Sequence, residues 1–88
     1  MADVQIYVTT YCPYCVRAKS LLTRKGVAFK EFDVEGDAAK RKWLLETTGQ
    51  RTVPQVFIDG TSVGGCDDLH ALDRSGELDR LLGRSPSA

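Results

Sequence analysis

The stretch TYCPYCVRAKSLL, residues 10–22, joins a candidate strand to a candidate helix and contains two of the three cysteines of this chain. Just before it, residues 4–8 (VQIYV) alternate between aliphatic and other side chains, which predicts a short strand. Pro13 suits the first turn of a helix, where its missing N–H is no loss, and Gly26 is a natural terminator. The sequence therefore predicts a strand, a loop with cysteines, and a helix.

The rest of the chain continues this alternation. Strands are expected at residues 27–34, 55–58 and 62–63, with Asp59-Gly60 as the turn of a hairpin. Helices are expected from the N-cap Asp37 to Gly49 and from Asp67 or Asp68 onward, with a break at Ser75-Gly76 and one more apolar turn through Leu82. The order βαβαββα predicts an α/β fold: a mixed four-stranded sheet flanked by helices, with a parallel βαβ unit and an antiparallel hairpin. The residues expected to face inward are Phe29, Phe32, Ala39, Trp43, Leu44, Phe57 and Ile58.

Length and composition limit the class of protein. Eighty-eight residues with 42% hydrophobic content predict one domain over residues 1–88, with a flexible tail at residues 83–88. Twelve Lys plus Arg balance twelve Asp plus Glu, so no overall basic field favours nucleic acid or a membrane surface as a partner. No segment has the length of a transmembrane span, and three cysteines are too few for a disulfide-stapled secreted domain. We expect a cytoplasmic monomer.

Cys12 and Cys15 lie in unequal positions along the predicted helix. The helix N-terminus offers free N–H groups and the positive end of the helix dipole, both of which favour a thiolate at Cys12, whereas Cys15 lies one turn inside. Cys12 is therefore the candidate nucleophile and Cys15 the candidate resolving cysteine. Two other roles for the pair are weaker. A zinc site would need further ligands from Cys66, His70 or carboxylates without a second CxxC, and a structural disulfide would close too short a loop to stabilise much.

Three motifs together resemble the dithiol glutaredoxins of the thioredoxin superfamily: Cys12-Pro13-Tyr14-Cys15, Thr52-Val53-Pro54 and Gly64-Gly65-Cys66-Asp67-Asp68. The resemblance covers about residues 4–82. It implies a thioredoxin-like fold and a glutathione-dependent thiol–disulfide oxidoreductase without a metal. The implied partners are glutathione as co-substrate and disulfide-containing or glutathionylated proteins, with ribonucleotide reductase as one candidate.

The resemblance also assigns roles to individual residues. Pro54 is expected to follow a cis peptide bond, so that the backbone of Val53 can pair with an extended cysteine-containing ligand. The N–H groups of Cys66 and Asp67 are expected to hold the α-carboxylate of glutathione, and the Asp67 side chain its ammonium. Without the resemblance, Asp67 would be interpreted as an N-cap. The expected glutathione-binding set is Tyr14, Arg41, Thr52, Val53, Pro54, Gly65, Cys66 and Asp67.

The chain departs from the family pattern at Thr9, where many members have a lysine. The absence of this lysine leaves the expected site with one positive charge fewer, for which Arg41, Arg51 or Lys40 can compensate. The Cys66 thiol is expected to be a small buried hydrophobe, and His70 a solvated side chain.

Two other functions remain open at this point. One is a redoxin for ribonucleotide reductase that is recycled by thioredoxin reductase, with which Thr9 is compatible. The other is a carrier in which two protomers share an iron–sulfur cluster through Cys12 and two glutathiones, which Pro13 disfavours.

Overall fold

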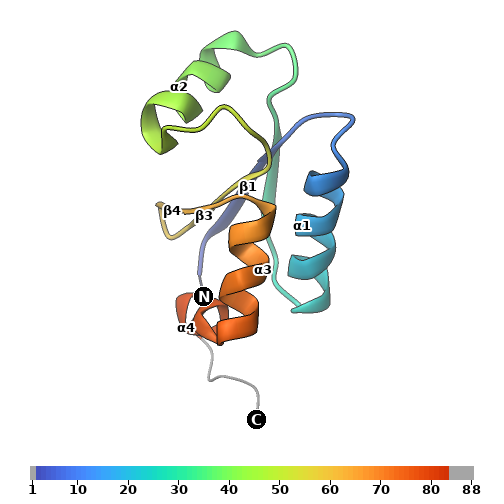
Figure 1. The fold of residues 1–88 in the computed structure, drawn as a ribbon, viewed down its shortest axis with the longest axis vertical. Coiled ribbons are helices and arrows are strands. Elements are labelled where there is room, and N and C mark those ends of the chain that lie inside the picture. Colours follow the sequence, from blue (N-terminus) through green and yellow to red (C-terminus); the bar gives the residue numbers. More distant parts are fainter. Residues whose placement is uncertain (1, 84–88) are drawn as a thin grey trace.

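Four strands and four helices make up the fold, and the computed structural model describes residues 2–83. The elements are β1 (Val4–Val8), α1 (Pro13–Arg24), β2 (Lys30–Asp33), α2 (Ala38–Thr48), β3 (Gln55–Ile58), β4 (Thr61–Gly64), α3 (Cys66–Ser75) and α4 (Glu77–Leu81) (Figure 1). The strand order in the sheet is β2-β1-β3-β4. The β1–β2 pair is parallel and the other two pairs are antiparallel, which confirms the predicted mixed sheet with one βαβ unit and one hairpin.

The two faces of the sheet pack against different helices. Val4, Ile6 and Val8 of β1 lie in the main core, which also contains buried residues of α1, α3 and α4. Tyr7 lies on the opposite face and packs in a smaller cluster with Phe57 and with Leu44 of α2. Because both faces are covered, all four residues of β3 are buried, a pattern that simple alternation does not show.

The prediction of which residues face inward was only partly correct. Leu44, Phe57 and Ile58 are buried as predicted, and Phe29 is partly buried against the main core. Trp43 and Phe32, however, are 41% and 37% exposed, and Ala39 is exposed. The reason is that the second face has a small cover, in which the Phe32 ring stacks on Tyr7 (5.0 Å) and the Trp43 ring on Phe57 (5.6 Å) with their outer sides in solvent.

Element boundaries differ from the prediction by a few residues in the second and fourth strands and in the last long helix, and β4 spans Thr61–Gly64 rather than residues 62–63. The second strand begins at Lys30 rather than residue 27, because the N–H of Val27 donates to the carbonyl of Leu22 (3.0 Å) and prolongs the turn after α1. The last long helix begins at Cys66, one residue before the earliest predicted start. Gly76 has φ 83° and separates α3 from α4, at the break that the sequence predicts. Residues 84–88 of the expected tail lie outside the described residues, and the single-domain boundary stays a prediction.

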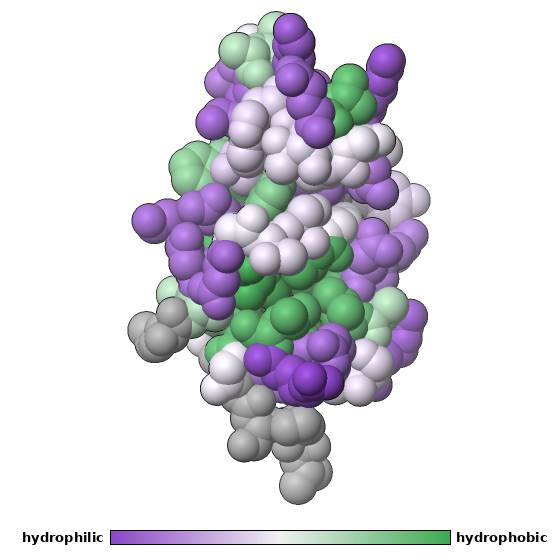
Figure 2. Space-filling model, turned by 90° about the vertical axis from the view of Figure 1, so that its left-hand side faces the viewer, coloured by the Kyte–Doolittle hydropathy of each residue, from purple (hydrophilic) through white to green (hydrophobic). Residues whose placement is uncertain are grey.

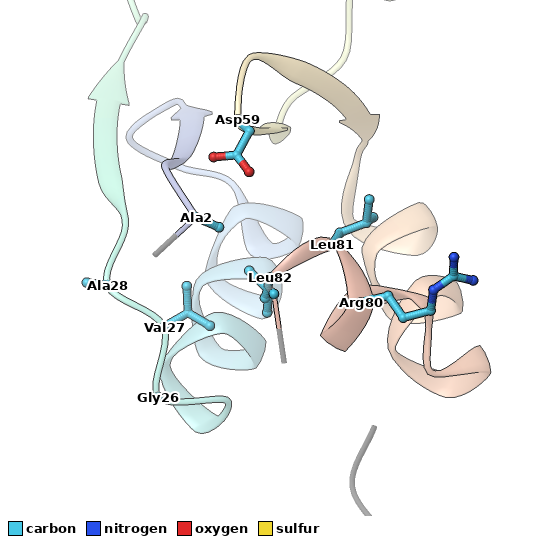
Figure 3. Close-up of a pocket in the computed structure, with 9 residues that line it drawn as sticks. Ala2, Gly26, Val27, Ala28, Asp59, Arg80, Leu81 and Leu82 are labelled. Atoms are coloured by element: carbon cyan, nitrogen blue, oxygen red, sulfur yellow. The ribbon is translucent and has the colours of Figure 1, made fainter. Parts of the chain in front are cut away.

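The two ends of the sheet carry different surfaces. The β1–α1 loop, which ends at Cys12, lies at the carboxyl end of β1, whereas a cavity of about 670 Å³ lies where the chain enters β1. Figure 3 shows Ala2, Val27, Leu81 and Leu82 around that cavity, which contains no cysteine. Figure 2 shows hydrophobic side chains in the lower half of one face, on the side of the molecule where α4 lies. None of the helices within residues 2–83 has the length and apolar content needed to cross a membrane.

Candidate active site

Cys12 is the N-cap of α1 and follows the carboxyl end of β1. Its backbone is extended (φ −143°, ψ 100°), and the N–H of Cys15 donates to its sulfur at 3.1 Å. Pro13 then occupies the first helical turn, as predicted. The Cys12 sulfur thus accepts a hydrogen bond at the positive end of a helix, which stabilises negative charge on that atom.

Cys15 lies one turn further along α1 and is 1% exposed. The pKa of the Cys15 thiol is raised to about 12, mainly by burial and to a smaller extent by a hydrogen bond with Cys12. Cys15 is therefore protonated at neutral pH, while Cys12 is half-exposed. The two cysteines, three positions apart, therefore differ in their access to solvent.

The Val53–Pro54 peptide bond is cis, which confirms the expectation for this loop. The Cys12 thiol donates to the Val53 carbonyl over 3.6 Å, so that loop lies directly against the cysteine. This contact affects the expected pairing of the Val53 backbone with a ligand, because the Val53 carbonyl accepts a hydrogen bond while Cys12 is a thiol. A thiolate has no proton to donate, so deprotonation of Cys12 frees the carbonyl for a ligand.

A cleft of about 520 Å³ extends from this loop to the start of α3. It brings together seven of the eight predicted glutathione-binding residues, and Arg41 is the one that does not line it. The lining residues are Tyr14, Gln50, Arg51, Thr52, Val53, Pro54, Gly65, Cys66, Asp67 and Asp68. The cleft thus has Tyr14 of the Cys12–Cys15 motif on one side and the N-terminus of α3 on another, and Cys12, which does not line it, contacts its Val53.

The start of α3 distinguishes the two neighbouring aspartates. Asp68 accepts a hydrogen bond from the N–H of Gly65 (3.1 Å) and completes the helix cap. Asp67 is exposed, and its carboxylate has no hydrogen bond or ion pair with any residue in the described range. The capping hydrogen bond of α3 is therefore made by Asp68 and not by Asp67. Gly64 has φ 98°, and a side chain there would collide with Asp68.

Cys66 and His70 are neighbours on α3. Cys66 is 6% exposed within the main core, as predicted, and burial and nearby Asp67 raise the pKa of its thiol. His70 is not simply solvated, since its Nδ1 lies 2.9 Å from the Cys66 carbonyl and 3.5 Å from the Cys66 sulfur. Within residues 2–83, no three His, Cys, Asp or Glu side chains are grouped as a metal ion would require.

Of the two arginines considered for the site, both exposed, only one lines the cleft. Arg51 lines the cleft, whereas Arg41 lies on α2 and its Nη2 donates to the Arg51 carbonyl (3.5 Å). Thr9, where many family members have lysine, is half-buried before the cysteine loop. Arg51 is therefore the arginine nearest the cleft, with Arg41 behind it.

Gln55 is a structural support of the cleft that the sequence did not reveal. It is 0% exposed, and its Nε2 donates to the Thr52 carbonyl (2.8 Å) and to Gln50 Oε1 (3.0 Å). These bonds hold the loop that precedes Pro54. The only sequence signal of this role is a glutamine directly after a proline, because the burial of Gln55 is known only from the structure.

Comparisons with known proteins agree with this geometry. The glutaredoxin family model matches residues 4–63. Glutaredoxin 3 of Escherichia coli is 56% identical over 82 residues, covering 93% of this chain and 99% of that protein. A glutaredoxin of Pseudomonas aeruginosa is also 56% identical, covering 93% and 98% of the two chains.

Solved structures show the same fold. A buckwheat glutaredoxin–glutathione complex superposes with a TM-score of 0.87 at 36% identity, covering 93% of this chain and 77% of the other. The holo form of glutaredoxin C1 from a poplar hybrid (Populus tremula x tremuloides) gives a TM-score of 0.86 at 37% identity, covering 92% and 83%. With a family model that matches most of the sequence and a thioredoxin-like fold that carries the cysteine pair at the start of α1, this chain belongs to the glutaredoxin family and is a glutaredoxin-type thiol oxidoreductase.

Proposed function

We propose that this protein uses glutathione to reduce glutathione mixed disulfides and protein disulfides, with Cys12 as nucleophile and Cys15 as resolving cysteine. The observation that carries this proposal is the placement of half-exposed Cys12 at the N-terminus of α1, with its sulfur against Val53, which lines the 520 Å³ cleft. A relative of similar fold was solved as a complex with glutathione, which supports the same ligand here.

Glutathione fits the cleft in one orientation by charge. Its γ-glutamyl α-carboxylate would lie at the N–H groups of Cys66 and Asp67, because the first N–H groups of a helix have no partner within it. The unpaired Asp67 carboxylate would bind the adjacent ammonium. Arg51, backed by Arg41, is the candidate cation for the glycine carboxylate at the other end.

The middle of the tripeptide would then lie along the loop before β3. The Val53 backbone would bind its cysteine residue, flanked by Thr52 and Pro54, and the exposed Tyr14 ring would lie near the sulfur. Gly65 provides the close approach at this point, since a side chain there would lie 3.1 Å from the Pro54 carbonyl.

Reduction of a glutathionylated protein requires Cys12 alone. The Cys12 thiolate attacks the glutathione sulfur, the disulfide bond breaks, and the protein leaves as a thiolate that takes up a proton. A second glutathione thiolate then attacks the glutathionylated Cys12. It forms glutathione disulfide and regenerates the Cys12 thiolate.

Reduction of a protein disulfide requires both cysteines. Cys12 attacks one sulfur of the substrate and forms a mixed disulfide, and the second substrate sulfur leaves as a thiolate. Cys15 then loses its proton and attacks the Cys12 sulfur, which releases the reduced substrate and leaves a Cys12–Cys15 disulfide. Two glutathiones reduce this disulfide and leave as glutathione disulfide.

Two cysteine variants test these roles. Cys12→Ser is expected to abolish turnover of both substrate types, whereas Cys15→Ser is expected to retain turnover of a small glutathione mixed disulfide and to lose reduction of a protein disulfide. Turnover is measured through glutathione reductase and NADPH consumption. Activity retained in Cys12→Ser would refute the assignment.

The open alternatives have their own measurements. Turnover with thioredoxin reductase in place of glutathione would indicate a redoxin, and ribonucleotide reductase is then the substrate to assay. Visible absorption after anaerobic reconstitution with iron and sulfide would indicate a cluster carrier. We expect neither, and we expect a monomer that works in the cytoplasm.

A further inference from the structure

A basic groove runs between α1 and α3, beside the cleft. Figure 1 shows these two helices side by side, and they enclose a hollow of about 500 Å³. Arg17 and Arg24 line it from α1, and His70 and Arg74 line it from α3. Within the lining, Asp67 is the one carboxylate, so the groove is positive in a chain whose formal net charge is zero.

The three arginines of this groove have no acidic partner within residues 2–83. The ion pairs found there join Lys19 to Glu31, Lys25 to Asp73 and Asp79, and Arg80 to Glu77. Arg17, Arg24 and Arg74 are all exposed. Like charges placed side by side without counterions repel, so an anionic ligand in the groove would gain from all three.

The spacing of the arginines indicates an extended ligand. Arg17 and Arg24 are seven residues apart on one helix, which places them on the same side and about 10 Å apart along its axis. A single carboxylate cannot contact both. A chain segment that carries two or three carboxylates can contact Arg24 and Arg74 while its near end reaches Arg17, two residues after Cys15.

The groove is continuous with the proposed glutathione cleft, because Cys66 and Asp67 line both. Cys12 packs against the core cluster that contains Cys66, so a substrate protein that reacts at Cys12 would bring its flanking residues close to this junction. Glutathione bound in the cleft would neutralise Asp67 through its ammonium. That neutralisation would leave the arginines of the groove with no opposing carboxylate in its lining.

We propose that the α1–α3 groove binds an acidic segment of the substrate protein next to its reactive cysteine, and so selects acidic substrates. This inference rests on the proposed function and names its substrate class. The attraction comes from exposed charges, so it acts on association and on KM and falls with ionic strength.

Three synthetic peptides test the proposal. Each carries one glutathionylated cysteine followed by three aspartates, three asparagines or three lysines. Wild-type protein is expected to turn over the aspartate peptide about tenfold more efficiently (kcat/KM) than the lysine peptide at low salt, a ratio built from two or three exposed pairs. The ratio should approach one in 0.5 M NaCl, a concentration at which the Debye length is only about 4 Å.

The double variant Arg24→Glu/Arg74→Glu should reverse this preference and favour the lysine peptide. Lys30→Glu/Lys42→Glu is the matched control, since it makes the same change in net charge at exposed positions on β2 and α2 that do not line the groove. The control should keep the wild-type preference. Arg24→Gln/Arg74→Gln should remove the preference without reversing it, and far-ultraviolet circular dichroism checks that each variant is folded.

A small mixed disulfide of glutathione and 2-mercaptoethanol separates the two proposals. If no variant with intact cysteines turns it over, the proposed function fails. If it is turned over but the wild type shows equal kcat/KM for the three peptides, the proposed function stands and the docking groove is refuted. A preference that the control variant also reverses would be due to net charge and would likewise refute the groove.

Discussion

The two ends of the sheet differ in how completely their polar groups are paired. At the end with the cysteines, the Asp67 carboxylate has no partner among residues 2–83, and the groove of unpaired arginines begins there and extends along α1 and α3 to Arg24 and Arg74. At the other end, the Lys25 ammonium contacts both Asp73 (2.9 Å) and Asp79 (3.0 Å), and α4 contributes Leu78 to the core. Unpaired groups thus lie where ligands can pair with them, while paired charges and apolar side chains hold the fold together elsewhere.

The sharpest test of this division is Leu78→Ala at the paired end. Leu78 is 0% exposed, so its truncation leaves a cavity and should lower the free energy of unfolding by about 3 kcal/mol, more than a hundredfold in the equilibrium constant. Urea denaturation measures this loss. The kcat/KM for the small mixed disulfide should be unchanged at temperatures where both proteins are folded. A large fall in kcat/KM of the folded variant would show that the ends are not independent.

The second test uses pH at the cysteine end. The raised pKa of Cys15 means that its thiolate fraction increases about tenfold per pH unit below that pKa, so the resolving step should accelerate about a hundredfold from pH 7 to pH 9. Stopped-flow measurement of substrate release from a preformed Cys12 mixed disulfide reports this step. Cys15→Ser should show no such release at any pH in this range. A resolving rate that is flat between pH 7 and pH 9 would contradict the burial argument.

Much of the fold was predictable from the sequence, and the reasons are local. The alternation in residues 4–8, the proline after Cys12 and the glycine at the break before α4 each fix a backbone conformation or a face, so the element order and the mixed sheet were predicted correctly. The cleft residues were predicted through the family motifs rather than from physics alone, and their ligand contacts stay predictions.

What the sequence did not reveal depends on packing between distant segments. Trp43 and Phe32 are exposed because α2 covers only a small part of the second face of the sheet. The size of the covered area cannot be predicted from the sequence of α2. Glutamine side chains are mostly exposed, so the sequence does not indicate that Gln55 is buried. Its complete burial results from the packing on both faces of β3. The basic groove forms only when Arg24 and Arg74, fifty residues apart, meet across two helices.

The third test compares the two neighbouring aspartates at the start of α3. Asp67→Asn should raise the KM for glutathione about tenfold, the loss of one charge-assisted hydrogen bond, and should leave the Tm unchanged. Asp68→Ala, the comparison variant, removes the acceptor of the Gly65 N–H and should lower the free energy of unfolding by about 1 kcal/mol. Steady-state kinetics and thermal denaturation of both variants give the comparison. A normal KM in Asp67→Asn would remove Asp67 from the glutathione site.

The smallest expected effect comes from Gln55, which lies inside the sheet yet supports the cysteine end. Gln55→Met keeps the length of the side chain but removes the Nε2 bonds to Gln50 and Thr52, so the loop before Pro54 loses its anchor. The KM for glutathione should rise about threefold, the cost of one weak hydrogen bond.

Stability should change little in this variant, within about 1 kcal/mol, because Gln55 Oε1 is buried without a hydrogen-bond partner within residues 2–83 and its removal offsets part of the loss. Leu78→Ala, in contrast, should change stability and leave KM unchanged. If Gln55→Met instead lowers stability strongly and leaves KM unchanged, the loop is held by other contacts. Buried hydrogen bonds would then stabilise the fold at both ends of the sheet, and the two ends would differ only in their unpaired surface charges.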